Sequence, residues 1–364
     1  MAISAVDAIP LAFEHTRQQL FRPFRFGQWT RLAIVGLLAG ELGSGGFSGS
    51  GFHFPPHAGT SPHSIGPGLS GMDAALLASL IAVLVVVGVI FGLIMMYISS
   101  VMRFILFDSV IAKECRIRQG WGRRQGAGWR YFLWQLLYLF TMIFGSLVLI
   151  AVPLALAFAA GWLKDAKEHV IPLVLAAVLL FFVLMIFIVS MSVVYVLTKD
   201  FVVPQMALEN IGVIEAWQRL WPMIRNEKGG YAAYIGMKIL MAIGSGIVVG
   251  IATLILGLII AIPTVGLSIL AILTGKSAGL TWNAYTITLA VVIGSVLLAV
   301  FLYLVALISV PVIVFFPAYS IYFFAGRYPA LLPLLYPAPI QTTGAAYIPP
   351  GQPPPLPPAP EPAG

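Results

Sequence analysis

The chain reads SAGLTWNAYTITLAVVIGSVLLAVFLYLVALISVPVIVFFPAYSIYFFAG over residues 277–326, which is fifty positions without an Asp, Glu, Lys or Arg. Four further charge-free stretches cover residues 74–102, 131–163, 170–198 and 239–275. About 20 apolar residues are enough to cross the hydrocarbon core of a bilayer. Each stretch can therefore span a membrane at least once. The sequence predicts an all-α, polytopic transmembrane helix bundle.

Composition supports the same class. Of the 364 residues, 60% are hydrophobic and 9% are charged, whereas about 25% of the residues of a soluble domain are charged. A soluble fold of this length could not cover that much apolar surface. We interpret the net charge of +7 as positive charge at a membrane surface, and we expect no nucleic-acid partner.

The spans are expected to form three helix hairpins, about six spans in all, within residues 29–102, 131–198 and 229–326. Trp29, Trp129 and Tyr231 open the three units at a nearly constant spacing, which is typical of duplicated segments. The alternative is chance recurrence of the interface aromatics that any membrane protein needs. The first span, residues 29–42, is short for a full crossing.

The segments outside the hairpins carry most of the positive charge. They are an N-terminal amphipathic helix in residues 1–28, a basic connector in residues 103–130, a connector with an amphipathic helix in residues 199–228, and a Pro-rich tail in residues 327–364. Sixteen of the 20 Lys and Arg residues lie in or beside them. Because positive loops stay in the cytoplasm, we predict a bacterial inner-membrane protein with both termini cytoplasmic.

Three of these segments suggest partners. Residues 103–130 could touch anionic lipid, although topology signalling alone explains their charge. The Pro-rich tail could dock on a protein partner, or have none. The two amphipathic helices could lie on the lipid bilayer or pack against the bundle. Their apolar positions are Val6, Ile9, Phe13 and Leu20 in the first, and Val213, Trp217, Leu220, Trp221 and Ile224 in the second.

The external loop of the first hairpin, residues 43–71, is rich in Gly, Ser, Pro and His. His53, His57 and His63 are weak candidate metal ligands, because histidine is a common ligand. Their spacing matches no compact metal site, and no carboxylate or cysteine joins them in residues 43–71. Incidental histidines are the simpler interpretation, and we expect no cofactor.

Few polar groups lie at membrane depth, where they usually mark function. Lys238 is expected to extend towards the cytoplasmic face, and Glu41 to lie at the outer end of the first short helix. The sequence also predicts that Pro311 and Pro317 break the last stretch. Two GxxxG pairs predict close helix packing, and they are Gly88 with Gly92 and Gly246 with Gly250.

The sequence contains no GxSxG, HExxH, P-loop or Rossmann motif, so no known set of catalytic residues is recognisable. We therefore expect a non-enzymatic membrane protein that acts as a scaffold or assembly partner. The alternative is a transporter or lipid-handling protein, which repeats and broken helices permit. A membrane-embedded enzyme is the third possibility.

Three short motifs suggest a family. Val203-Pro204 is followed by Glu215-Ala216-Trp217 and by Gly229-Gly230-Tyr231 at the start of a span. This combination resembles the membrane domain of some bacterial glycerophosphodiester phosphodiesterases, which also occurs in stand-alone membrane proteins. The likeness covers residues 21–328. In that family the phosphodiesterase is a separate soluble barrel, for which this chain has no segment, so the resemblance implies no such activity.

Overall fold

The computed structural model describes residues 3–41, 74–162, 167–277 and 283–336. Within these ranges the ordered elements are all helical and none is a strand, so the predicted all-α class is confirmed. The loop of residues 43–71 with its three histidines lies outside the described residues. The tail of residues 337–364 lies outside them too.

Five helices of the described chain are long and apolar enough to cross a membrane. They are α3 (Ala74–Ala112), α4 (Ile117–Ala159), α5 (Val170–Leu197), α8 (Lys228–Ser277) and α9 (Ala284–Ala325). The short helix α2 (Phe26–Leu38) has 13 residues, or about 20 Å at 1.5 Å per residue. It is too short to join them, so the described residues hold five candidate spans where the sequence predicted about six.

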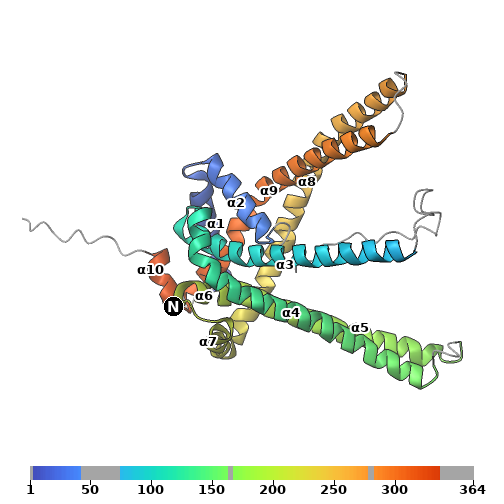
Figure 1. Cartoon of the computed structure of the whole chain (residues 1–364). Coiled ribbons are helices and arrows are strands. Elements are labelled where there is room, and N and C mark those ends of the chain that lie inside the picture. Colours follow the sequence, from blue (N-terminus) through green and yellow to red (C-terminus); the bar gives the residue numbers. More distant parts are fainter. Residues whose placement is uncertain (1–2, 42–73, 163–166, 278–282, 337–364) are drawn as a thin grey trace, which may run out of the picture.

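The long helices converge at one end, from which α3 projects alone, α4 together with α5, and α8 together with α9 (Figure 1). We call the converging end the root region. It also holds α1 (Ala8–Phe21), α6 (Val203–Glu209), α7 (Val213–Asn226), the short turn η2 (Pro329–Leu331) and α10 (Leu332–Leu335). Two of the predicted hairpins form, because α4 packs along α5 and α8 along α9. The first does not extend as expected, since α2 packs against α9 and α3.

The core of the protein is aromatic and lies in the root region. Tyr131, Tyr234 and Phe201 come from different elements and are fully buried, as are Tyr319 and Phe323 of α9. Tyr234 stacks on Tyr319 with 5.1 Å between ring centroids. Offset-stacked and edge-to-face aromatic pairs add stability beyond the area that they bury. The packed core therefore holds together helices that are far apart in the sequence.

Both ends of the described chain lie on the root side. The hydroxyl of Tyr319 donates a hydrogen bond to the carbonyl of Ala5 at 3.0 Å. The guanidinium of Arg327, just after α9, donates to the carbonyl of Ile3 at 2.9 Å. These contacts place the N-terminal segment against the C-terminal end of the last span.

Helix α9 runs without interruption through Pro311 and Pro317, so the predicted break there is wrong. A proline inside a membrane helix is tolerated where neighbouring elements surround the freed backbone carbonyl. Both prolines lie in the buried half of α9, which packs against α1 and α2.

The amphipathic helices both pack on the protein, α7 mostly and α1 only partly through the expected apolar face. α1 buries Ala8, Ala12 and His15 and leaves Val6 and Phe13 exposed. α7 buries Val213 and Leu220 of the predicted apolar face but exposes Trp221. The apolar side chains that remain outside can enter a membrane interface.

The GxxxG glycines are not at close helix contacts within this chain. A methyl group built on Gly88, Gly92, Gly246 or Gly250 would meet no atom of another described segment within 4 Å. Close helix packing through these glycines stays a prediction.

Candidate functional site

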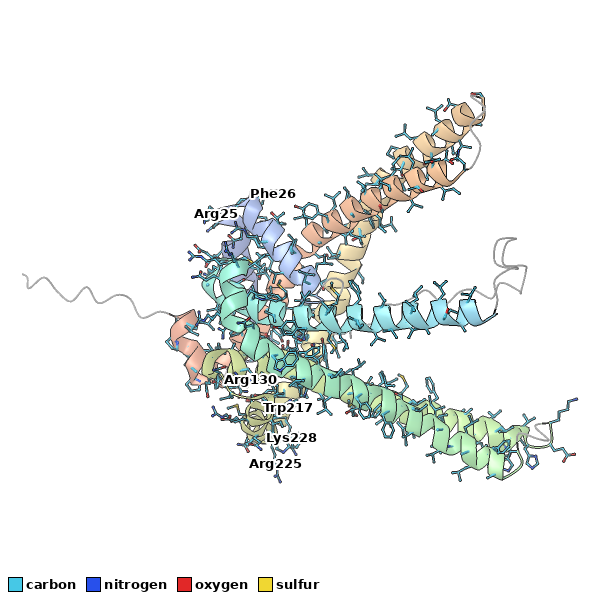
Figure 2. All side chains as sticks on the ribbon, viewed as in Figure 1. Arg25, Phe26, Arg130, Trp217, Arg225 and Lys228 are labelled. Atoms are coloured by element: carbon cyan, nitrogen blue, oxygen red, sulfur yellow. The ribbon has the colours of Figure 1, made fainter. Side chains whose placement is uncertain are left out.

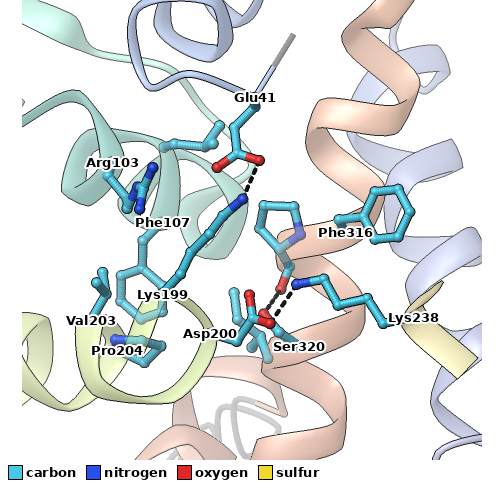
Figure 3. Close-up of a pocket in the computed structure, with 13 residues that line it drawn as sticks. Glu41, Arg103, Phe107, Lys199, Asp200, Val203, Pro204, Lys238, Phe316 and Ser320 are labelled. Atoms are coloured by element: carbon cyan, nitrogen blue, oxygen red, sulfur yellow. Dashed lines mark hydrogen bonds and ion pairs between the residues drawn. The ribbon is translucent and has the colours of Figure 1, made fainter. Parts of the chain in front are cut away.

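The root region encloses five charged side chains from four parts of the chain, which we call the charged cluster. Its members are Glu41, Arg103, Lys199, Asp200 and Lys238. Figure 3 shows them around a small cavity of about 30 Å³, with Phe316 and Ser320 of α9 on its wall. A cavity of that size holds one or two water molecules. In this conformation it is too small for an organic substrate.

A π-helical turn, η1 (Thr198–Val202), supplies two of the charges. It joins α5 to α6, and single π-turns of this kind are frequent at functional sites. Lys199 and Asp200 are adjacent in this turn, but they form ion pairs with different partners. Lys199 lies 2.5 Å from a carboxylate oxygen of Glu41, while Asp200 pairs with Lys238 of α8.

The Asp200–Lys238 ion pair is the most enclosed. Both side chains are 4% exposed, and Asp200 also accepts a hydrogen bond from the hydroxyl of Tyr234 at 2.9 Å. The ammonium of Lys238 lies 5.8 Å from the centre of the Tyr234 ring. The sequence predicted a Lys238 side chain that extends towards the cytoplasmic face; the ammonium is instead buried inside the root region, where Asp200 neutralises it.

Glu41 is also misplaced by the sequence analysis. It was expected at the outer end of a spanning helix, on the face opposite Lys199, yet the two residues form an ion pair. The cause is the shortness of α2, which keeps Glu41 in the root region. Burial raises the pKa of the Glu41 carboxyl, but the positive charges of Lys199 and Arg103 outweigh that effect, so the pKa lies below its usual value.

Arg103 of α3 is the member of the charged cluster that forms no ion pair with a carboxylate of the described residues. Its guanidinium donates to the hydroxyls of Tyr131 at 2.6 Å and Tyr195 at 3.0 Å, and to the carbonyl of Ala39 at 3.0 Å. The buried Nε atom has no partner within the described chain. The three cations and two carboxylates leave the charged cluster with one net positive charge.

Two further ion pairs fasten the connectors beside this cluster. Arg124 of α4 grips Asp108 of α3 through two hydrogen bonds of 2.7 and 2.6 Å. Arg327 grips Glu227 in the same way at 2.7 and 2.6 Å. Bidentate pairs fix orientation as well as distance. They hold the ends of the long helices in one arrangement around the charged cluster.

The structure describes some of the predicted site residues and leaves others outside the described ranges. Lys238 and Glu41, predicted separately, belong to one charged cluster. His53, His57 and His63 lie outside the described residues. Within the described ranges, no three His, Cys, Asp or Glu side chains gather as metal ligands would.

The sequence analysis missed Arg103, Lys199 and Asp200, because it counted the two cations as topology signals at the ends of spans and gave Asp200 no role. One signal was available. A lysine at the depth of Lys238 needs a counter-charge, and Asp200 is the carboxylate beside the end of the preceding span. The tyrosines that receive Arg103 had no comparable signal, since aromatic residues are common at interfaces.

Chemically, the charged cluster is suited to holding helices or binding a small anion. Each carboxylate already has a cation, and the hydroxyl of Ser320 donates a hydrogen bond to the carbonyl of Pro317 at 2.8 Å. The partner of this hydroxyl is therefore a backbone carbonyl, which cannot act as the general base that activates a serine nucleophile.

Comparison with known proteins gives a family for the chain. Residues 3–334 match a family described as "Family of unknown function (DUF7544)". No curated protein and no solved structure matches the chain. The resemblance to the membrane domain of glycerophosphodiester phosphodiesterases finds no support in these comparisons. Since the match covers nearly the whole sequence, the chain belongs to the DUF7544 family of unknown function.

Proposed function

We propose that this protein is a non-enzymatic membrane scaffold, in which a rigid root region presents separate apolar helices to other membrane proteins. The contrast between root and spans is the observation that carries the proposal. In the most apolar window of each candidate span, between 0% and 6% of the residues are buried by the rest of the chain. The root region buries its aromatic and charged side chains.

This contrast favours assembly because lipid alone provides little force to hold helices together or apart. The chain places its stabilising contacts in the root region, where ion pairs and stacked rings join the helices. The spans are left with long uncovered faces, such as the one that carries the stacked pair Phe140 and Phe144 on α4. Partner helices can pack on such faces without unfolding anything.

Photocrosslinking in native membranes tests the proposal. A photoreactive amino acid is placed at Phe140 or Phe144 of full-length protein, and a buried control position is used at Tyr319. We expect discrete crosslinked species of higher mass from the α4 positions and none from the control. Tagged and untagged copies expressed together separate self-association from a different partner. Crosslinks to lipid alone at several exposed span positions would refute the scaffold.

A lipid-handling or transport function is the second candidate, and the positive excess of the charged cluster favours it. An anion would find Arg103, Lys199 and Lys238 around one cavity. The cavity of about 30 Å³ would have to widen for any such substrate. Transfer of a fluorescent anionic phospholipid across proteoliposomes, compared between wild type and Arg103→Gln, tests this candidate. Equal transfer in protein-free vesicles would reject it.

We further propose that the membrane is a bacterial inner membrane with the root region in the cytoplasm. The support is the gathering of cations in the root region, including Arg103, Arg124, Arg130, Lys199 and Arg327. Positive charge is retained on the cytoplasmic side of such membranes.

A further inference from the structure

We propose that a second hollow, at the corner between α1 and α2, binds the headgroup of an anionic phospholipid that carries a free hydroxyl. Phosphatidylglycerol represents this chemical class. The site is separate from the charged cluster, and it does not depend on the scaffold function. It lies where the N-terminal helices meet the end of α3.

The hollow has a volume of about 340 Å³ and a basic lining. Arg22, Arg25 and Lys113 line it together with a single carboxylate, Glu114. Glu114 is engaged by Arg116 at 2.9 Å, whereas none of the three lining cations forms an ion pair with a described residue. Lys113 donates a hydrogen bond to the side-chain oxygen of Gln18 at 2.9 Å. Cations without a carboxylate partner around a hollow of this size suit a phosphate group.

Exposed aromatic side chains alternate with the arginines. Phe21, Phe24 and Phe26 are 54%, 59% and 59% exposed, in the sequence Phe21-Arg22-Pro23-Phe24-Arg25-Phe26. The ring of Trp29 packs against those of Phe21 and Phe24, with 5.7 Å between ring centroids in each pair. Apolar rings beside cations are typical of segments that lie at the boundary between headgroups and acyl chains. This arrangement favours a lipid over a water-soluble phosphate compound.

The position in the molecule agrees with a membrane-surface site. Figure 2 shows Arg25 and Phe26 on one side of the root region, and Arg130, Trp217, Arg225 and Lys228 on the other. Trp129, next to Arg130 in the sequence, and Trp221 of α7 are also exposed. Basic and aromatic side chains thus border the region from which the spans project, as expected of the headgroup level.

The side chain of Gln19 indicates that the headgroup carries a hydrogen-bond donor in addition to the phosphate. This side chain lines the hollow and is buried, with 4% exposed. The amide nitrogen donates to the carbonyl of Ser109 at 2.9 Å, but the amide oxygen has no hydrogen-bond partner in the described chain. A buried acceptor without a partner is costly. A hydroxyl on the headgroup would satisfy it, while the arginines hold the phosphate.

Lipid binding to the full-length protein in detergent tests the proposal by native mass spectrometry. Phosphatidylglycerol, phosphatidylcholine and phosphatidylmethanol are titrated, the last having the same charge without the headgroup hydroxyls. We expect one saturable phosphatidylglycerol site, with phosphatidylcholine binding about tenfold more weakly. Phosphatidylmethanol should lie between the two. Equal binding of phosphatidylmethanol and phosphatidylglycerol would overturn the assignment of a hydroxyl partner to Gln19.

Two double variants locate the site. Arg22→Gln/Arg25→Gln should weaken phosphatidylglycerol binding by about tenfold. The control Arg118→Gln/Arg123→Gln removes the same charge from exposed positions outside the hollow and should leave binding unchanged. Equal losses in both variants would mean attraction by general surface charge and would overturn the site. Unchanged binding in Arg22→Gln/Arg25→Gln would do the same.

The source of the phosphate is distinguished by competition and by the aromatic rim. Inorganic phosphate at millimolar concentration should not displace the lipid, and Phe24→Ser/Phe26→Ser should weaken lipid binding with both arginines present. Displacement by inorganic phosphate would identify a site for a soluble anion instead. Circular dichroism of each variant confirms that the fold is kept, which is expected because these side chains are exposed.

Discussion

Lys238 and Asp200 face each other from different helices, and both side chains are buried. Breaking a buried ion pair leaves an uncompensated charge, which typically costs about 3–5 kcal/mol. We therefore predict that Asp200→Asn or Lys238→Met lowers the free energy of unfolding by about that amount. Thermal unfolding in detergent measures it.

The double variant separates the ion pair from its surroundings. Asp200→Asn/Lys238→Met should be more stable than the sum of the single losses implies, because both charges are removed together. Glu14→Gln is the control, since its pair with Arg17 is on the surface and contributes little. Additive losses in the double variant would show that the two residues act independently.

We predict that the stability of the folded protein depends on pH through His15, which lies in the root region. Its imidazole bonds to the carbonyl of Val110 at 2.8 Å and to the hydroxyl of Tyr322 at 3.1 Å. Burial lowers the pKa of His15 below its usual 6.5; Lys113 adds to this shift, and the bond to Val110 opposes it. The folded protein therefore binds the proton less readily than the unfolded chain, so the contribution of His15 to stability is lost as the pH falls below 6.5.

The measurement compares wild type with His15→Gln at pH 7.5 and pH 5.5. Wild type should lose more thermal stability than the variant between these two values, because only wild type carries the buried imidazole. The difference between the two proteins removes the effect of all other titrating groups. An identical decrease in both would rule out the role of His15.

At the scale of elements, α2 depends on one glycine for its packing against α9. A methyl group on Gly36 would lie 2.5 Å from the Cδ1 atom of Ile313, which is itself buried. We predict that Gly36→Ala costs about 1–3 kcal/mol of stability through overpacking. Gly27→Ala in the same helix meets nothing within 4 Å and should be neutral or slightly stabilising.

Rescue makes this prediction specific. Ile313→Ala in the Gly36→Ala background opens the space that the new methyl group needs and should recover part of the lost stability. Denaturation of the four proteins in one detergent gives the comparison. Equal destabilisation by Gly27→Ala would show that the loss arises from helix propensity or detergent, and not from the contact with α9.

The long helices could be predicted from the sequence because apolar runs are a strong signal that needs no tertiary information. Residues 74–102, 131–163 and 170–198 all lie within or largely within observed helices. α2 was less predictable. Its apolar face is equally consistent with a short span and with a helix packed beside the root region, and the choice depends on α9, which is almost 250 residues away in the sequence.

The charged cluster could be predicted only in part, for the same reason. Lys238 and Glu41 stand out because each interrupts or borders an apolar run. Their partners, Lys199 and Asp200, come from η1. The local sequence of this turn does not indicate which helices it packs against. The hydroxyls that receive Arg103 belong to α4 and α5, so their role follows from the three-dimensional packing of those helices and not from spacing.

At the scale of the whole molecule, the structure places both described ends and Glu41 on the root side, and the tips of the hairpins on the other. We predict that cysteines at Ser4 and Tyr336 react from the same face of the membrane, and that a cysteine at Glu168, in the tip between α4 and α5, reacts from the opposite face. The native Cys115 is replaced by serine in all three proteins.

An impermeant maleimide applied to sealed inverted and right-side-out vesicles measures the sidedness. In the unaltered protein, Cys115 should react slowly even when the root side is accessible, because the thiol is buried and burial raises its pKa, which lowers the fraction of reactive thiolate. Labelling of Ser4→Cys and Glu168→Cys from one face would mean that the α4–α5 hairpin lies on the membrane surface. The proposed scaffold would then have no spanning arm at that position, and the cytoplasmic assignment of the root region would lose its basis.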